Sequence, residues 1–189
     1  TGARAVALAS EKLRPSAIMT EAAFRNALRV LQAIGGSTNG LVHLAAIAGR
    51  LGFDLDYAEF DRMGAETPVL VDLKPSGAHY MEDLNKAGGL APVLRELADM
   101  LDLDCRTVSG RTLGDDLAAA PDPWPQTVVR PMSDPIYASG GMRMLTGNLA
   151  PNGAVIKQAA ATPTLLKHTG RAVVFSSLAD MAARIDSPD

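Results

Sequence analysis

Two amphipathic helix patterns separated by a short glycine-rich turn place the strongest constraint on this sequence. After Thr20, a residue suited to cap a helix, apolar residues recur at helical spacing up to Ile34, where Gly35 and Gly36 stop the pattern. A second helical pattern begins at once and ends at Gly52. The polar residues between the two helices are therefore predicted to lie in a tight turn.

Shorter elements follow this pair. Asp56 begins a capping-box spacing, which predicts a short helix through Met63. Residues 69–71 are a candidate buried strand, and residues 72–77 are predicted to form a loop because Pro and Gly break regular structure. Pro92 stands where the first turn of another helix is expected, since a missing N–H costs nothing there.

A change of composition then divides the chain. Between residues 117 and 126 the sequence becomes rich in Ala and Pro, which suits an extended linker. Short apolar runs beyond it predict strands at residues 127–129, 142–145, 154–156 and 171–175, and a closing helix follows at 178–185. We expect residues 1–120 to end an α/β domain, 121–136 to form a linker, and 137–189 to begin a β-rich domain.

Composition limits both the core and the partners of the chain. Apolar residues make up 47% of the 189 residues and aromatic residues only 4%, so the core must be aliphatic, which favours mixed α/β layers. The net charge is −3 without a basic block, which argues against nucleic acid as a partner. No apolar run is long enough to span a membrane and no signal peptide is evident, so we expect a cytoplasmic protein.

The single cysteine limits the chemistry further. Cys105 can form no intrachain disulfide and no thiolate-only metal site by itself. It lies among apolar and acidic residues, so we expect a structural thiol. We expect His43 to be a hydrogen-bonded core or surface residue and His168 to be a surface residue. No complete catalytic signature, such as a Walker loop, occurs in the sequence.

The turn residues Ser37, Thr38 and Asn39 are the first candidate site. Free backbone N–H groups at a helix N-terminus, together with polar side chains, can hold a carboxylate or a phosphate. The alternative is an ordinary capped turn, because Ser, Thr and Asn are common caps.

The loop that bears Lys74 and Ser76 is the second candidate site. It offers a cation and a hydroxyl, and the residues that follow, His79, Tyr80, Glu82 and Asp83, could transfer protons or bind a metal. The alternative is a solvated loop that leads into a helix with acidic residues in its first turn.

Several motifs in order resemble the central region of the family that contains dihydroxy-acid dehydratase and phosphogluconate dehydratase. They are Ala33-Ile34-Gly35-Gly36-Ser37-Thr38-Asn39, Asp72-Leu73-Lys74-Pro75-Ser76-Gly77, Met81-Glu82-Asp83-Leu84 and Gly147-Asn148-Leu149-Ala150-Pro151-Asn152-Gly153. Residues 165–175 look most like the sugar-acid dehydratases that act on pentonates such as arabinonate or xylonate. Residues 132–137 depart from the Leu-Asp-Asn-Pro pattern usual in those enzymes.

The resemblance implies a hydro-lyase that converts a 2,3-dihydroxy carboxylic acid, here a sugar acid, into a 2-keto-3-deoxy acid. It implies an α/β/α domain followed by a barrel-like domain, a homo-oligomer, an iron–sulfur cluster and Mg²⁺. The ligands of both cofactors and the catalytic serine fall outside the matched region, so this chain is expected to be an internal fragment that holds no catalytic or metal-binding residue. Ser37, Thr38, Asn39, Lys74 and Ser76 are the residues expected to bind substrate.

Two other interpretations stay open. A dihydroxy-acid dehydratase of branched-chain amino acid biosynthesis would share these motifs but differ in the size and polarity of its pocket. A non-catalytic binding or assembly module derived from the family would also account for the single cysteine.

Overall fold

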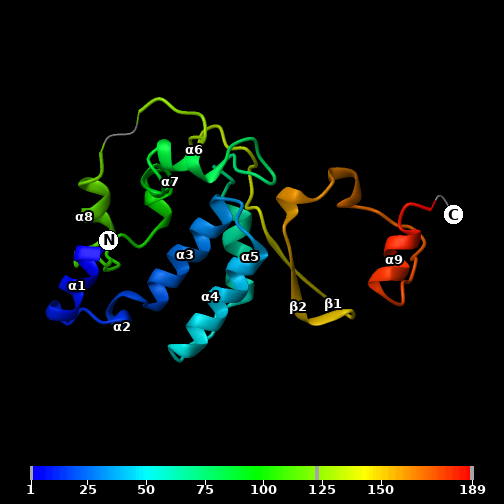
Figure 1. Cartoon of the computed structure of the whole chain (residues 1–189), viewed down its shortest axis with the longest axis horizontal. Helices are drawn as coiled ribbons and strands as arrows, with labels where there is room; N and C mark the ends of the chain where they lie inside the picture. Colours follow the sequence, from blue (N-terminus) through cyan, green and yellow to red (C-terminus); the bar gives the residue numbers. More distant parts are fainter. Residues whose placement is uncertain (1, 122–123, 188–189) are drawn as a thin grey trace.

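The computed structural model describes residues 2–121 and 124–187. Most helices gather on one side, and the hairpin and last helix extend from the other (Figure 1). The elements are α1 (Gly2–Glu11), α2 (Pro15–Ile18), α3 (Glu21–Ala33), α4 (Thr38–Arg50), α5 (Tyr57–Glu66), α6 (Met81–Lys86), α7 (Ala91–Glu96), α8 (Leu113–Ala118), β1 (Arg143–Gly147), β2 (Ala150–Ile156) and α9 (Leu178–Arg184), with 3-10 helices at Ala98–Met100, Gln158–Ala160 and Pro163–Leu165. This mixture agrees with the predicted α/β class, and the layered arrangement of the domains stays a prediction.

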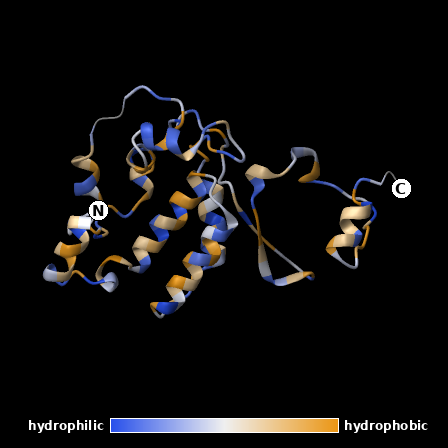
Figure 2. Cartoon of the chain, viewed as in Figure 1, coloured by the Kyte–Doolittle hydropathy of each residue, from blue (hydrophilic) through white to orange (hydrophobic). Residues whose placement is uncertain are grey.

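Three predicted helices begin at the caps that the sequence suggests. The Thr20 hydroxyl accepts a hydrogen bond from Ala23 N at 3.2 Å, and the Ser37 hydroxyl accepts one from Asn39 N at 3.2 Å. The Asp56 carboxylate caps α5 in the same way. Hydrophobic and hydrophilic residues alternate along α3, α4 and α5 (Figure 2), so each helix turns an apolar stripe toward its neighbours.

The predicted buried strand at residues 69–71 is extended and lies between two other extended segments. Val69 pairs antiparallel with Tyr137, and Val71 pairs antiparallel with Val129. Leu70 is completely buried between these pairs. Each of these pairs is an isolated β-bridge, so the three extended segments do not form a regular sheet in the described part of the chain.

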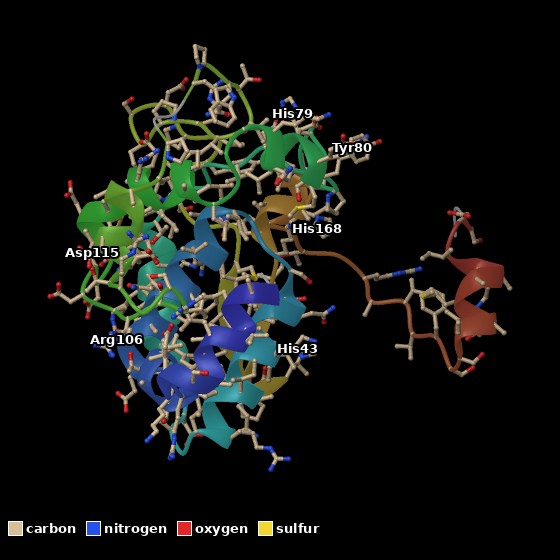
Figure 3. The ribbon with its side chains drawn as sticks, turned by 60° about the vertical axis from the view of Figure 1, so that its left-hand side comes forward. His43, His79, Tyr80, Arg106, Asp115 and His168 are labelled. Atoms are coloured by element: carbon tan, nitrogen blue, oxygen red, sulfur yellow. The ribbon has the colours of Figure 1, made fainter. Side chains whose placement is uncertain are left out.

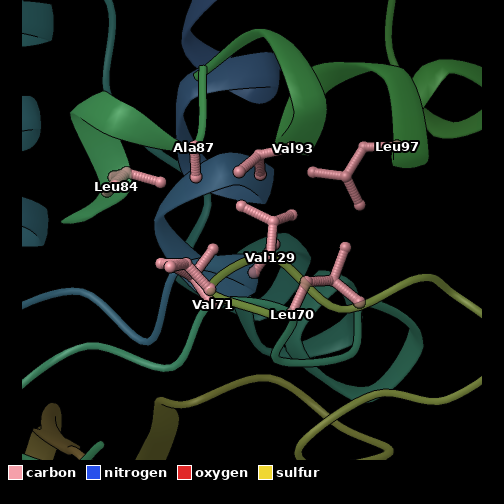
Figure 4. Packing of buried hydrophobic residues seen from close by; sticks show 9 residues of the cluster. Leu70, Val71, Leu84, Ala87, Val93, Leu97 and Val129 are labelled. Atoms are coloured by element: carbon pink, nitrogen blue, oxygen red, sulfur yellow. The ribbon is translucent and has the colours of Figure 1, made fainter. Parts of the chain in front are cut away.

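A first aliphatic cluster covers these paired segments. Side chains from α6 and α7 pack onto the extended residues (Figure 4). The members of the cluster are Ala33, Leu70, Val71, Leu84, Ala87, Val93, Leu97, Val128 and Val129. A fully buried aliphatic side chain stabilises the fold by about 1.5–3 kcal/mol, so this cluster fixes the segments on either side of residues 72–77.

The predicted strands at 142–145 and 154–156 form the antiparallel hairpin β1–β2, in which Arg143 lies opposite Ile156. Met142, just before β1, is completely buried in a second cluster with Leu28, Leu41, Phe60 and Met63. The hairpin is thereby attached to α3, α4 and α5.

The strand predicted at residues 171–175 is wrong. These residues have no strand partner within the described chain, and Val173 and Val174 are exposed. A strand needs a neighbour to accept and donate its backbone hydrogen bonds. Here the Val174 carbonyl accepts a hydrogen bond from Arg184 in α9, and the Arg184 guanidinium lies 5.0 Å from the Phe175 ring centre. The predicted closing helix itself is confirmed as α9.

Three α-helices of the described chain, α1, α2 and α8, were not predicted. α1 buries no residue, so it has no apolar stripe to reveal it. α8 does begin with a capping box between Thr112 and Asp115, a signal that was present in the sequence.

The predicted domain division stays a prediction. Within the proposed linker, Val128 and Val129 are buried in the first cluster, so that part of it is packed. In the part of the chain that the structure describes, no helix is long and apolar enough to cross a membrane.

Candidate functional site

The turn between α3 and α4 presents the start of α4 to the surface. Gly35 adopts φ +55°, a conformation that favours glycine, and a side chain at Gly36 would collide with Leu31 at 2.4 Å. Of the three possible caps, Ser37 is the one that takes this role. Ser37 and Asn39 are exposed, and Thr38 is half-buried.

Capping does not use every backbone donor of this turn. The hydroxyl and carbonyl of Ser37 accept hydrogen bonds from Asn39 N and Gly40 N. Among the described residues, the Thr38 N–H has no acceptor. The free N–H groups of a helix N-terminus attract anions, so Thr38 offers a donor to a carboxylate.

The loop at residues 72–77 folds back on itself. Lys74 N donates to the His79 carbonyl at 2.8 Å, and Gly77 N donates to the Leu73 carbonyl at 2.8 Å. A side chain at Gly77 would lie 2.2 Å from a carboxylate oxygen of Asp72, so only glycine fits there. This closure presents Lys74 and Ser76 on an exposed tip.

Lys74 is held by its neighbour Tyr80. The Lys74 ammonium donates to the Tyr80 hydroxyl at 2.6 Å and lies 4.0 Å from the centre of the ring. Both side chains are exposed, so the cation is oriented by the ring and still accessible to a ligand.

The residues after the loop form the helix with acidic residues in its first turn that the alternative interpretation predicts. Asp83 accepts a hydrogen bond from Tyr80 N at 2.8 Å and caps α6, and Glu82 pairs with Lys86 at 2.8 Å. His79 lies between the loop and α6, next to Tyr80 (Figure 3), and its Nε2 is 3.7 Å from a carboxylate oxygen of Asp72. The acidic residues therefore stabilise a helix start.

The two candidate loops meet around a narrow cleft. Gly35 from the turn and Ser76 from the loop both line it, together with Tyr137 and Ala159 from the C-terminal part. Its volume is about 20 Å³, room for roughly one water molecule. Ser37, Thr38, Asn39 and Lys74 do not line the cleft itself.

Larger cavities lie elsewhere. One of about 460 Å³ lies between α5 and the hairpin, beside Arg62 and Asn152. Another of about 390 Å³ lies beside Arg95 and Met132. Neither contains a predicted site residue.

The described residues do not fit the implied metal cofactors. No three His, Cys, Asp or Glu side chains within residues 2–121 and 124–187 come together as metal ligands would. Burial, reinforced by the nearby Asp102 carboxylate, raises the pKa of the Cys105 thiol, which disfavours a thiolate. His43 and His168, both labelled in Figure 3, are exposed, and neither lines the cleft.

Sequence reasoning missed one residue near the site. Gln32 is completely buried at the end of α3, directly beneath the turn. The signal was available, because Gln32 stands four residues after Leu28 on the apolar stripe of α3, where a polar side chain needs partners.

The structure thus places an exposed helix N-terminus near a loop that bears a lysine and a serine, and groups of these kinds can bind a polar small molecule. Residues 1–116 match the model for the N-terminal part of the dihydroxy-acid/6-phosphogluconate dehydratases, and residues 127–189 match the model for their C-terminal part. The chain belongs to this dehydratase family, which confirms the resemblance seen in the sequence.

Individual relatives agree with this assignment. The chain is 49% identical to an L-arabonate dehydratase of Azospirillum brasilense and 48% identical to an L-arabinonate dehydratase of Rhizobium leguminosarum bv. trifolii, over 98% of its own length and 32% of theirs in each case. It is 45% identical to a dihydroxy-acid dehydratase of Syntrophobacter fumaroxidans, over 97% of its own length and 33% of that protein. The chain thus spans about one third of the relatives that it matches.

Proposed function

We propose that this chain is part of a hydro-lyase that dehydrates a sugar acid to a 2-keto-3-deoxy acid. The observation that supports this most directly is the meeting of the Gly35 turn and the Ser76 loop around one cleft. The names of the relatives from Azospirillum brasilense and Rhizobium leguminosarum bv. trifolii support a pentonate, L-arabinonate, as substrate.

In this proposal the chain binds the substrate and does not perform the chemistry. The Thr38 N–H and the polar side chains of Ser37 and Asn39 receive the carboxylate, because the start of α4 carries a partial positive charge. Lys74, oriented by Tyr80, and Ser76 receive hydroxyl groups. Because the cleft is only about 20 Å³, the substrate lies over its mouth, where four of these five side chains are exposed.

The iron–sulfur cluster and Mg²⁺ of the family belong to this proposal only as groups held by residues outside this chain. When bound, they supply a Lewis acid for the departing hydroxyl. Homo-oligomer formation and a cytoplasmic location are further parts of the proposal.

A second candidate is the dehydration of a branched-chain dihydroxy acid, which the 45% identity to a dihydroxy-acid dehydratase favours. The two substrates differ in polarity: a pentonate presents more hydroxyl groups, and a branched-chain acid presents methyl groups. Lys74 and Ser76 are polar and exposed, so they favour the pentonate.

The test is dehydration by the full-length protein that contains this chain, with 2-keto acid formation as the measurement. We expect L-arabinonate to be turned over at a higher kcat/KM than a branched-chain dihydroxy acid. Replacing Lys74 with Met should raise KM about tenfold, since it removes a charged contact, and Lys86→Met, on the exposed side of α6, is the matched control. Preference for the branched-chain acid would establish the second candidate, and absence of turnover with both acids would favour a non-catalytic module.

A further inference from the structure

Gln32 occupies a place where three parts of the chain converge. It is completely buried, and its side-chain carbonyl accepts a hydrogen bond from Met142 N at 3.0 Å. Its side-chain amide donates to the Phe60 carbonyl at 3.5 Å. The Gln32 side chain thereby joins α3 to α5 and to the segment that leads into β1.

The backbone carbonyl of Gln32 joins the turn to the segment before β1. Its carbonyl accepts hydrogen bonds from Gly35 N at 3.1 Å and from Gly141 N at 3.4 Å. Gly35 begins the turn of the proposed site, and Gly141 lies in the part that matches the C-terminal family model. One residue therefore contacts both the turn and the second part of the chain.

Glycines around Gln32 allow this close approach. A side chain at Gly140 would lie 2.4 Å from the side-chain oxygen Oε1 of Gln32, and one at Gly64 would lie 2.7 Å from its side-chain nitrogen Nε2. A side chain at Gly141 would lie 2.9 Å from the Cα atom of Gly35. The packing leaves the Gln32 amide and the Gly35 turn little room to shift relative to residues 140–142.

We propose that Gln32 is a positioning residue, which sets the place of the Gly35–Asn39 turn against the C-terminal part and thereby against Ala159, whose N donates to the Gly141 carbonyl and which lines the same cleft. This inference rests on the proposed function of the turn in binding substrate. The buried amide has two defined partners, whereas an apolar side chain of the same volume would fill the space without fixing the distance to Met142. A small displacement of a binding group is enough to change affinity or rate substantially.

The test compares Gln32→Leu with Leu28→Ala in the full-length protein. Leu28 is buried one turn earlier on α3 and belongs to the second cluster, so its truncation removes apolar packing from the same helix without removing a hydrogen bond. We expect the factor by which Gln32→Leu raises KM for L-arabinonate to be about ten times the factor by which it lowers kcat. Leu28→Ala should leave KM within about twofold of its original value. Equal effects of the two variants on KM would overturn the inference.

Hydrogen exchange separates this inference from the proposed function because it needs no substrate. Gln32→Leu should speed exchange of the Gly40 and Met142 amides more than Leu28→Ala does, and unchanged exchange there would overturn the inference even in an active dehydratase. If the protein turns over no sugar acid, faster exchange still supports the coupling, and the proposed function alone fails. If Gln32→Leu does not fold, Gly140→Ala takes its place in both measurements. The methyl group that it adds would clash with the side-chain amide of Gln32 and displace it.

Discussion

Asp61 connects α5 to the hairpin, and its loss should measure how firmly the C-terminal part is attached. Its carboxylate accepts two hydrogen bonds from the Arg143 guanidinium and one from Met144 N, each 2.9 Å long. Hydrogen bonds to charged groups contribute about 1.5–3 kcal/mol when buried, and surface ion pairs only about 0–1 kcal/mol. Asp61 is 29% exposed and Arg143 34% exposed, so we expect Asp61→Ala to lower the free energy of unfolding by roughly 2 kcal/mol.

Urea unfolding of single and double variants is the assay. Arg143→Met removes two of the three hydrogen bonds and leaves the one from Met144 N, so it should cost about 1 kcal/mol, and the double variant should show a coupling energy of about 1 kcal/mol. High salt should shrink the coupling because the pair is partly exposed, and the urea m-value should stay constant. A cost of Asp61→Ala below about 0.5 kcal/mol, or no coupling, would show that water replaces these contacts and that the reasoning is wrong.

Two further predictions concern local structure. Gly77→Ala should destabilise the protein by about 1–3 kcal/mol because its Cβ has no space. Gly49→Ala, in the last turn of α4 with nothing within 4 Å of the added Cβ, should stabilise it by up to about 0.5 kcal/mol. Equal thermal shifts of the two variants would contradict this. The hydrogen bond from Arg184, followed by that from Ser176 N, lowers the pKa of Asp180 from 3.8 to about 2, so the stability it gives to α9 is full above pH 4 and lost as pH falls through 2. A carboxyl titration by NMR that gives an ordinary pKa for Asp180 would refute this contact.

Local features of the fold were predictable from the sequence, and pairings between distant segments were not. Thr20, Ser37 and Asp56 are confirmed as caps because capping depends on residues two or three positions away. The strand expected at 171–175 is wrong because apolar alternation says nothing of whether a partner strand is present. The bridge of Val71 to Val129 joins residues 58 positions apart, and no local pattern encodes it.

In the candidate site too, the local elements were predictable from the sequence and the contacts between distant segments were not. The sequence indicated both the turn and the loop, and the structure brings Gly35 and Ser76 to one cleft. That meeting depends on the buried segment around Leu70, whose backbone N donates to the carbonyl of Ala33 at the end of α3 at 2.7 Å. The contribution of Tyr137 and Ala159 to the cleft could not be predicted, since it depends on how the chain returns after the proline-rich stretch.

The two interpretations of the Ser37–Asn39 turn do not exclude each other. The cap occupies the Ser37 hydroxyl and the N–H groups of Asn39 and Gly40, and the Thr38 N–H stays available. A cap of this kind stabilises a helix by about 0.5–2 kcal/mol, which keeps the remaining donor in place before any ligand arrives. Preorganised donors bind an anion without the cost of ordering the backbone. The geometry that makes the turn an ordinary helix start is therefore compatible with the role that we propose for it, the binding of a substrate carboxylate.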